Sequence, residues 1–188
     1  MSPKRERPIS ADPILLPALA CSHLGAFVTL ILGSTETLSA GGRVARALVD
    51  AKLRLRFPSH MVTRCEKRGS QTFTEFTVGS LRVIVAIPLS DEAFNSAGAF
   101  AKNERQVFFV VPADDVEYAH HRIKKMRCRL EWVRVKSVDD FVTDYMHGVA
   151  TDLSLTPAQF CLKFIAEYNR RIAADGDPSL QVLLPAIE

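Results

Sequence analysis

The chain has 188 residues, of which 47% are apolar, 24% charged and 8% aromatic, and its formal net charge is +3. This composition excludes intrinsic disorder over most of the chain, and the length suits one domain with a sizeable core. The four cysteines show no Cys-x-x-Cys spacing and no histidine cluster, so we expect reduced thiols in a cytoplasmic protein rather than a zinc site.

Residues 1–40 form an N-terminal extension whose apolar run, Ile14 to Gly33, follows a short basic start. Export signals and membrane spans begin in the same way, so membrane insertion or export is one interpretation of this segment. Pro17 and the Cys21-Ser22-His23 group interrupt the run, however, and a polar loop without basic residues follows it. We therefore expect a buried helix here and no membrane partner.

The rest of the chain alternates between helical and extended patterns. Val44, Leu48 and Ala51 recur at helical spacing after the Gly41-Gly42 pair, which indicates a helix boundary. Leu81 to Ile87 is almost wholly apolar or β-branched, as expected for a strand buried on both faces. In chain order the pattern predicts a helix that Pro58 ends, strands at 60–65, 71–78 and 81–87, a helix at 91–103, a strand at 106–111, a helix at 114–126, a strand at 128–135, and helices at 138–146 and from 157.

The order of these elements predicts the fold class. From Gly41 to Val135 it is helix, three strands, helix, strand, helix, strand. That is the core order of the restriction-endonuclease-like fold, an α/β mixed sheet flanked by helices, although a different mixed α/β sheet also fits. We therefore assign residues 41–188 to a restriction-endonuclease-like α/β domain with extra C-terminal helices.

Cations gather in two segments, residues 43–68 and 122–136, while the chain beyond Val138 is acidic. If the two segments converge on one face, that face would neutralise the phosphates of duplex DNA. The alternative is a pair of solvated helix faces with no ligand. The candidate DNA contacts are Arg43, Arg54, Arg56, Arg64, Lys124, Lys125 and Arg127.

The stretch from Thr74 to Pro88 reads as a hairpin with one acid, Glu75, on its first strand. Metal-dependent nucleases carry carboxylates on a similar hairpin, because magnesium needs oxygen ligands and the attacking water needs a group that orients it. Asp50 is the candidate second magnesium ligand beside Glu75, and Lys52 is the candidate catalytic cation. The alternative is a structural pair between Glu75 and Arg82 across the hairpin.

Five short segments carry a family resemblance: "ALVDAKLRLRFP", "EFTVG", "VFFVVP", "FIAEYNRRI" and "DPSLQV". In this order they are similar to the C-terminal part of an uncharacterised bacterial restriction-endonuclease-like family encoded beside DNA cytosine methyltransferases. The resemblance covers about Gly41 to Val182 and implies a type II restriction endonuclease. The chain departs from the family pattern at two places: Glu75 stands where the family has an aspartate, and Ile84-Val85-Ala86 where it has a polar His-Val-Thr-like segment. Glutamate can still ligate a divalent cation, but the second change removes polar groups from the site.

Three functional hypotheses follow. The first is a magnesium-dependent endonuclease, or a degenerate relative, acting on duplex DNA in a restriction–modification or defence system. The second is a non-catalytic DNA-binding or assembly subunit on the same fold. The resemblance also implies a methyltransferase partner, and many nucleases of this kind form homodimers. A globular interaction domain without a nucleic-acid role is the third alternative.

Overall fold

The computed structural model describes residues 14–15, 23–35, 38–65, 73–126 and 130–183. One mixed sheet has the spatial order β2-β3-β4-β5-β6, with β2 (Val62–Cys65), β3 (Phe73–Val78), β4 (Leu81–Ala86), β5 (Val107–Val111) and β6 (Val133–Ser137). β2, β3 and β4 are antiparallel neighbours, whereas β5 and β6 join the sheet in parallel. The chain is therefore an α/β protein with a five-stranded mixed sheet, as the element order predicts.

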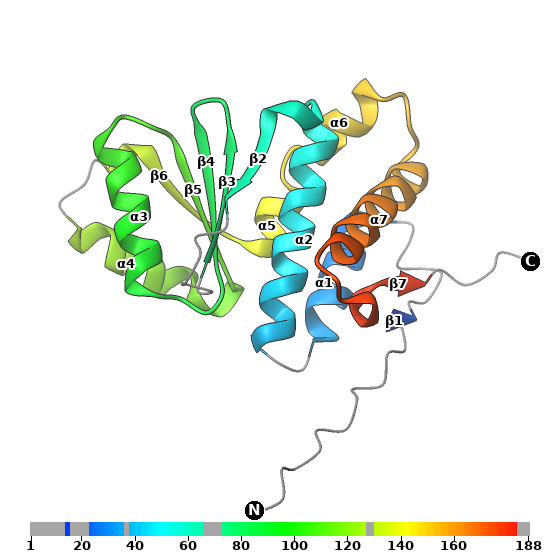
Figure 1. Cartoon of the computed structure of the whole chain (residues 1–188). Helices are drawn as coiled ribbons and strands as arrows, with labels where there is room; N and C mark the ends of the chain where they lie inside the picture. Colours follow the sequence, from blue (N-terminus) through cyan, green and yellow to red (C-terminus); the bar gives the residue numbers. More distant parts are fainter. Residues whose placement is uncertain (1–13, 16–22, 36–37, 66–72, 127–129, 184–188) are drawn as a thin grey trace, which may run out of the picture.

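Helices cover both faces of this sheet (Figure 1). One face carries α3 (Asp91–Lys102) and α4 (Val116–Lys125). The larger layer comprises α1 (Leu24–Gly33), α2 (Leu38–Arg56), α5 (Val138–Thr143), α6 (Met146–Asp152) and α7 (Pro157–Ala174). Short 3-10 helices lie at Ser59–Met61, Ala113–Asp115, Leu130–Trp132 and Pro178–Leu180.

β4 is buried on both of its faces. Val83 and Val85 pack into the core under α2, while Ile84 and Ala86 pack with the buried residues of α3. Because successive side chains of a strand point to opposite faces, both sets of neighbours must be apolar. This arrangement explains the nearly continuous apolar run in the sequence.

The start of α2 differs from the prediction. The helix begins at Leu38 and runs through both glycines, so the boundary expected at Gly41-Gly42 is wrong. A Cβ atom on Gly42 would lie 3.0 Å from the carbonyl oxygen of Ile87. Gly42 therefore allows α2 to approach the end of β4 closely, which explains a glycine inside a helix.

The apolar run near the N-terminus contributes a core helix, as predicted. Phe27 on α1 packs edge-on against Phe164 and Tyr168 of α7, with ring centroids 6.1 and 5.9 Å apart. β1 (Ile14–Leu15) pairs in parallel with β7 (Val182–Leu183). The domain boundary expected at residue 40 falls within α2, which shares its core with α1. None of the helices in the described ranges is both long and apolar enough to cross a membrane.

Polar caps fix the starts of two helices that the sequence predicts, α3 and α7. The Ser90 hydroxyl accepts a hydrogen bond from the amide of Ala93 at the start of α3. Thr156 and Gln159 form a reciprocal capping box at the start of α7. Such caps satisfy amides that have no partner inside the helix.

Two elements in the second half of the chain differ from the prediction. The helix expected at 138–146 is two helices, α5 and α6, because Tyr145 between them has a left-handed backbone with φ of 60°. The strand expected at 128–135 begins later, since Leu130–Trp132 forms a 3-10 turn before β6.

Candidate functional site

Glu75, the expected metal ligand, points into the layer that contains α3. Its carboxylate is only 7% exposed and accepts a hydrogen bond from the hydroxyl of Ser96 on α3. Its neighbours on the same face, Phe73 and Ile84, belong to the apolar cluster between the sheet and α3. Glu75 is therefore held in the interior by a polar contact between β3 and α3.

Asp50, the expected second ligand, lies on the other side of the sheet. It is 2% exposed, and its Oδ1 accepts a hydrogen bond from Nε of Arg54 at 2.7 Å. The sheet separates it from Glu75, so the structure does not bring the two expected ligands together. No three His, Cys, Asp or Glu side chains within the described ranges form a group that could hold a metal.

Lys52, the expected catalytic cation, is buried and acts on the backbone. Its Nζ donates hydrogen bonds to the carbonyl oxygen of Phe141 and, at 2.8 Å, to that of Asp144. The ammonium also lies 4.5 Å from the centroid of the Phe141 ring. Burial lowers the pKa of Lys52 from 10.5 to about 8, an effect that the nearby Asp144 carboxylate partly opposes. Lys52 therefore fixes the C-terminal end of α5.

The alternative pair of Glu75 with Arg82 is also not formed. The register places Glu75 opposite Ile84 and Arg82 opposite Thr77. The Arg82 guanidinium lies over the ring of Phe100, 4.7 Å from its centroid. Arg82 therefore packs against α3, and Ser96 holds the Glu75 carboxylate instead.

Most expected DNA contacts on α2 and β2 are paired inside the protein. Arg43 contacts Asp177 at 2.5 Å. Arg64 forms two hydrogen bonds with Asp175, at 2.7 and 3.3 Å. Together with the contact between Arg54 and Asp50, these pairs neutralise three of the four DNA contacts expected in the first basic segment. Pairing of this kind leaves less charge for phosphates.

Arg56, at the end of α2, is held differently from these cations. Its guanidinium lies 5.4 Å from the ring centroids of both Phe57 and Tyr145. No ion pair in the described parts of the chain involves it. Local patterns did not indicate this arrangement, because five strands and three α-helices separate Arg56 from Tyr145 along the chain.

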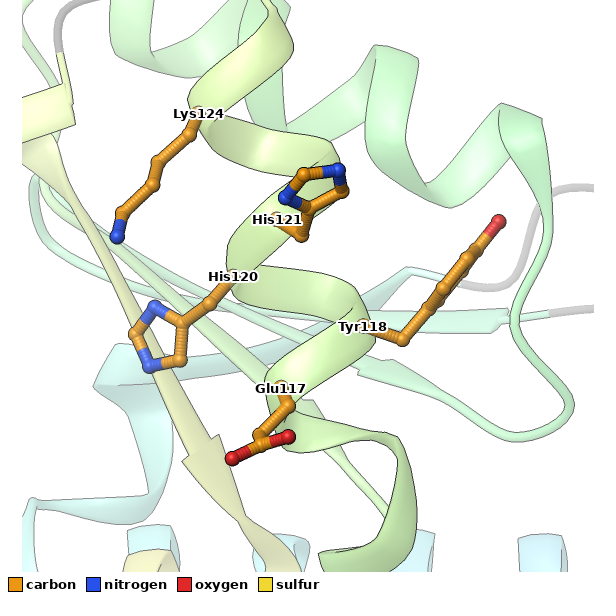
Figure 2. A pocket seen from close by; sticks show the side chains of 5 residues that line it. All are labelled: Glu117, Tyr118, His120, His121 and Lys124. Atoms are coloured by element: carbon orange, nitrogen blue, oxygen red, sulfur yellow. The ribbon is translucent and has the colours of Figure 1, made fainter.

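The lysines of α4, in the second basic segment, lie at the surface. Ala119 and Ile123 bury one side of α4, while Glu117, Tyr118, His120, His121 and Lys124 line an open hollow of about 710 Å³. Figure 2 shows His120 and Lys124 projecting from one side of the helix and Tyr118 from the other.

Lys125 is exposed too, and no described residue forms an ion pair with Lys124 or Lys125. Arg122 on the same helix pairs with Asp91. Arg127 lies outside the described residues. α2 and α4 cover opposite faces of the sheet (Figure 1), so the expected DNA contacts on α2 and those on α4 do not share one surface.

Comparisons of the chain with protein-family models, with curated proteins and with solved structures give no match. A functional assignment therefore rests on the sequence patterns and on the contacts described above.

Proposed function

We propose that the protein binds duplex DNA through the exposed face of α4 and does not cut it. The observation that carries this proposal is the surface cluster of His120, His121, Lys124 and Lys125, because the lysines have no acidic partner in the described structure. The fold would be restriction-endonuclease-like, as the element order and the family resemblance suggest.

The chemistry of α4 suits a phosphate backbone. Two lysine ammonium groups supply charge, and two histidines add hydrogen-bond donors next to them. Tyr118, about half exposed, offers an aromatic ring beside them. Contacts of this kind position a protein on DNA without reading its sequence, and they make affinity depend strongly on salt.

The buried carboxylates favour the non-catalytic hypothesis over the magnesium-dependent endonuclease. Hydrolysis with magnesium needs oxygen ligands around one ion and a group that orients water. Glu75 and Asp50 lie on opposite faces of the sheet, and the Lys52 ammonium is bound to two carbonyl groups. We therefore propose a degenerate relative of the nucleases. Its restriction–modification or defence setting, a methyltransferase partner and a homodimer belong to the proposal on the strength of the resemblance.

Fluorescence anisotropy with labelled duplex DNA over a series of salt concentrations tests the binding. We expect Lys124→Gln to weaken binding similarly for unrelated sequences and to reduce the slope of log K against log salt by about 1. Lys163→Gln is the matched control, since Lys163 is an equally exposed lysine on α7, away from α4. Equal losses in both variants, or no binding by the wild-type protein at low salt, would contradict the proposal.

Incubation of long unmethylated duplex DNA with the protein and magnesium tests the absence of cleavage. We expect intact DNA on a gel with and without EDTA. Cleavage that requires magnesium and disappears in Glu75→Ala would restore the endonuclease hypothesis. The two experiments are independent, because binding and cleavage are measured separately.

A further inference from the structure

A second hollow lies where the end of α2 meets α6, on the side of the sheet away from α4. Its volume is about 390 Å³. Leu55, Phe57, Tyr145 and Leu153 supply apolar and aromatic walls, and Arg56 and Asp152 add one charge of each sign. Small-molecule sites are typically concave, mostly apolar and equipped with a few polar groups.

We propose that this hollow binds a nucleotide, with the base stacked on Tyr145, the phosphate on Arg56 and a base N–H group on Asp152. The nucleotide is either a free mononucleotide or an unpaired nucleotide of a DNA strand, because both present a base and a phosphate to the hollow. The site is separate from the α4 surface of the proposed function and does not depend on it.

Tyr145 carries the stacking part of the proposal. Tyr145 is 69% exposed, whereas most aromatic residues are largely buried. Its backbone has φ of 60° and ψ of 9°, a left-handed conformation that costs free energy for any residue except glycine. Strained positions of this kind cluster at binding and catalytic sites.

The polar groups determine the class of ligand. The Arg56 guanidinium lies 5.4 Å from the ring centroids of Phe57 and Tyr145, which hold it in place while its N–H groups stay available. A planar guanidinium binds phosphate through two parallel hydrogen bonds. Asp152 is exposed on α6 and can accept a hydrogen bond from an amino group of a base. A ligand with a ring, an anion and a donor matches all three groups.

The frame beneath the hollow keeps Tyr145 in position. Lys52 donates hydrogen bonds to the carbonyl groups of Phe141 and Asp144, which end α5 directly before Tyr145. Met146, the next residue, is buried in the core. Tyr145 is therefore fixed on both sides along the chain, and its ring stands in the solvent at the edge of the hollow. Lys52 is a positioning residue for this site.

Isothermal titration calorimetry on the whole chain tests the proposal. The probes are the four deoxynucleoside 5′-monophosphates, the corresponding nucleosides, ribose 5-phosphate and a short single-stranded oligonucleotide. We expect the nucleotides to bind more tightly than either the nucleosides or ribose 5-phosphate. Tyr145→Ala should weaken binding about ten- to a hundredfold, the range expected for loss of one stacked base, whereas Tyr145→Phe should retain it.

Two further variants separate the roles. Arg56→Gln should bind nucleotides no more tightly than nucleosides. Leu30→Ala is the matched control, since it removes another exposed apolar side chain, on α1 and outside both proposed surfaces, and should leave binding unchanged. Binding of the oligonucleotide that Tyr145→Ala weakens, without binding of mononucleotides, would support the site and assign it to a DNA strand. Binding of the oligonucleotide that Tyr145→Ala leaves unchanged would overturn it. Binding of mononucleotides would support a free nucleotide.

Tyr145→Gly separates binding from folding. Glycine adopts the left-handed conformation without strain, so this variant should unfold at the same or a higher temperature and still lose the ligand. If Tyr145→Gly loses both stability and binding, the Tyr145 ring stabilises the fold rather than the ligand, and the proposal is overturned. No binding of any probe by the wild-type protein, or equal losses in Tyr145→Ala and Leu30→Ala, would overturn it as well.

Discussion

The buried ammonium group of Lys52 makes the stability of the protein depend on pH. Burial lowers its pKa in the folded state to about 8, below the ordinary value of 10.5. As the pH rises above 8, the folded protein releases this proton first, while the unfolded chain keeps it up to about pH 10.5. The unfolded chain then binds more protons, so the free energy of unfolding increases with pH across this window.

The size of the effect follows from the two pKa values. The complete change is on the order of 3 kcal/mol, and about 2 kcal/mol of it falls between roughly pH 7 and pH 9.5. Below pH 8 the group is charged in both states, and the folded state carries the full cost of its burial. The hydroxyl of Tyr168 gives a reason to stay below pH 10, because burial raises its pKa and its linkage has the opposite sign.

Urea unfolding at several pH values, for the wild-type protein and Lys52→Met, measures this contribution. Methionine has a similar length and cannot titrate, so the increase of stability with pH should shrink by about 2 kcal/mol in the variant. Lys163→Met, which removes an exposed lysine, should keep the wild-type dependence. If Lys52→Met follows the wild-type curve, the assignment of a lowered pKa to Lys52 is refuted.

Two further predictions concern buried contacts. A double-mutant cycle with Glu75→Ala and Ser96→Ala, measured by urea unfolding, should give a coupling energy of about 1.5–3 kcal/mol, because a carboxylate acceptor strengthens the hydrogen bond. A coupling energy near zero would contradict a structural role for this pair. Gly42→Ala should unfold more easily than Gly41→Ala by about 1–3 kcal/mol, since only at Gly42 does an added Cβ atom press against the carbonyl oxygen of Ile87. Equal stabilities of these two alanine variants would show that α2 moves aside without cost.

Local patterns were sufficient for most of the fold. The helix starts expected at residues 91 and 157 match those of α3 and α7. Ser90 and Thr156 cap these helices, and a capping side chain interacts with amides only a few residues away, so the signal is local. The apolar run of β4 likewise predicted a central strand. The helix boundary expected at Gly42 was wrong, because this glycine is required by the close approach of the distant carbonyl group of Ile87. The left-handed backbone of Tyr145, which separates α5 from α6, has no signal in the neighbouring sequence.

The candidate site was less predictable, because its contacts join distant parts of the chain. Glu75 was recognised as an unusual acid in an apolar hairpin, but its partner Ser96 lies 21 residues away. The first basic segment looked available for DNA, yet Arg64 pairs with Asp175, a separation of 111 residues. A count of charges along the sequence does not show such internal ion pairs. Lys124 and Lys125 on α4, in contrast, are exposed and have no acidic partner among the described residues.

The packing of α1 and α2 against α7 has a consequence for synthesis on the ribosome. Phe27 is synthesised early, whereas the two aromatic residues that its ring contacts, Phe164 and Tyr168, are synthesised much later. At about 5–20 residues per second, roughly 6–24 seconds pass between the ends of α2 and α7. During this interval α7 is not yet available to pack on the apolar side of α2. The nascent chain therefore exposes an apolar surface that chaperones can bind and that is buried in the finished protein.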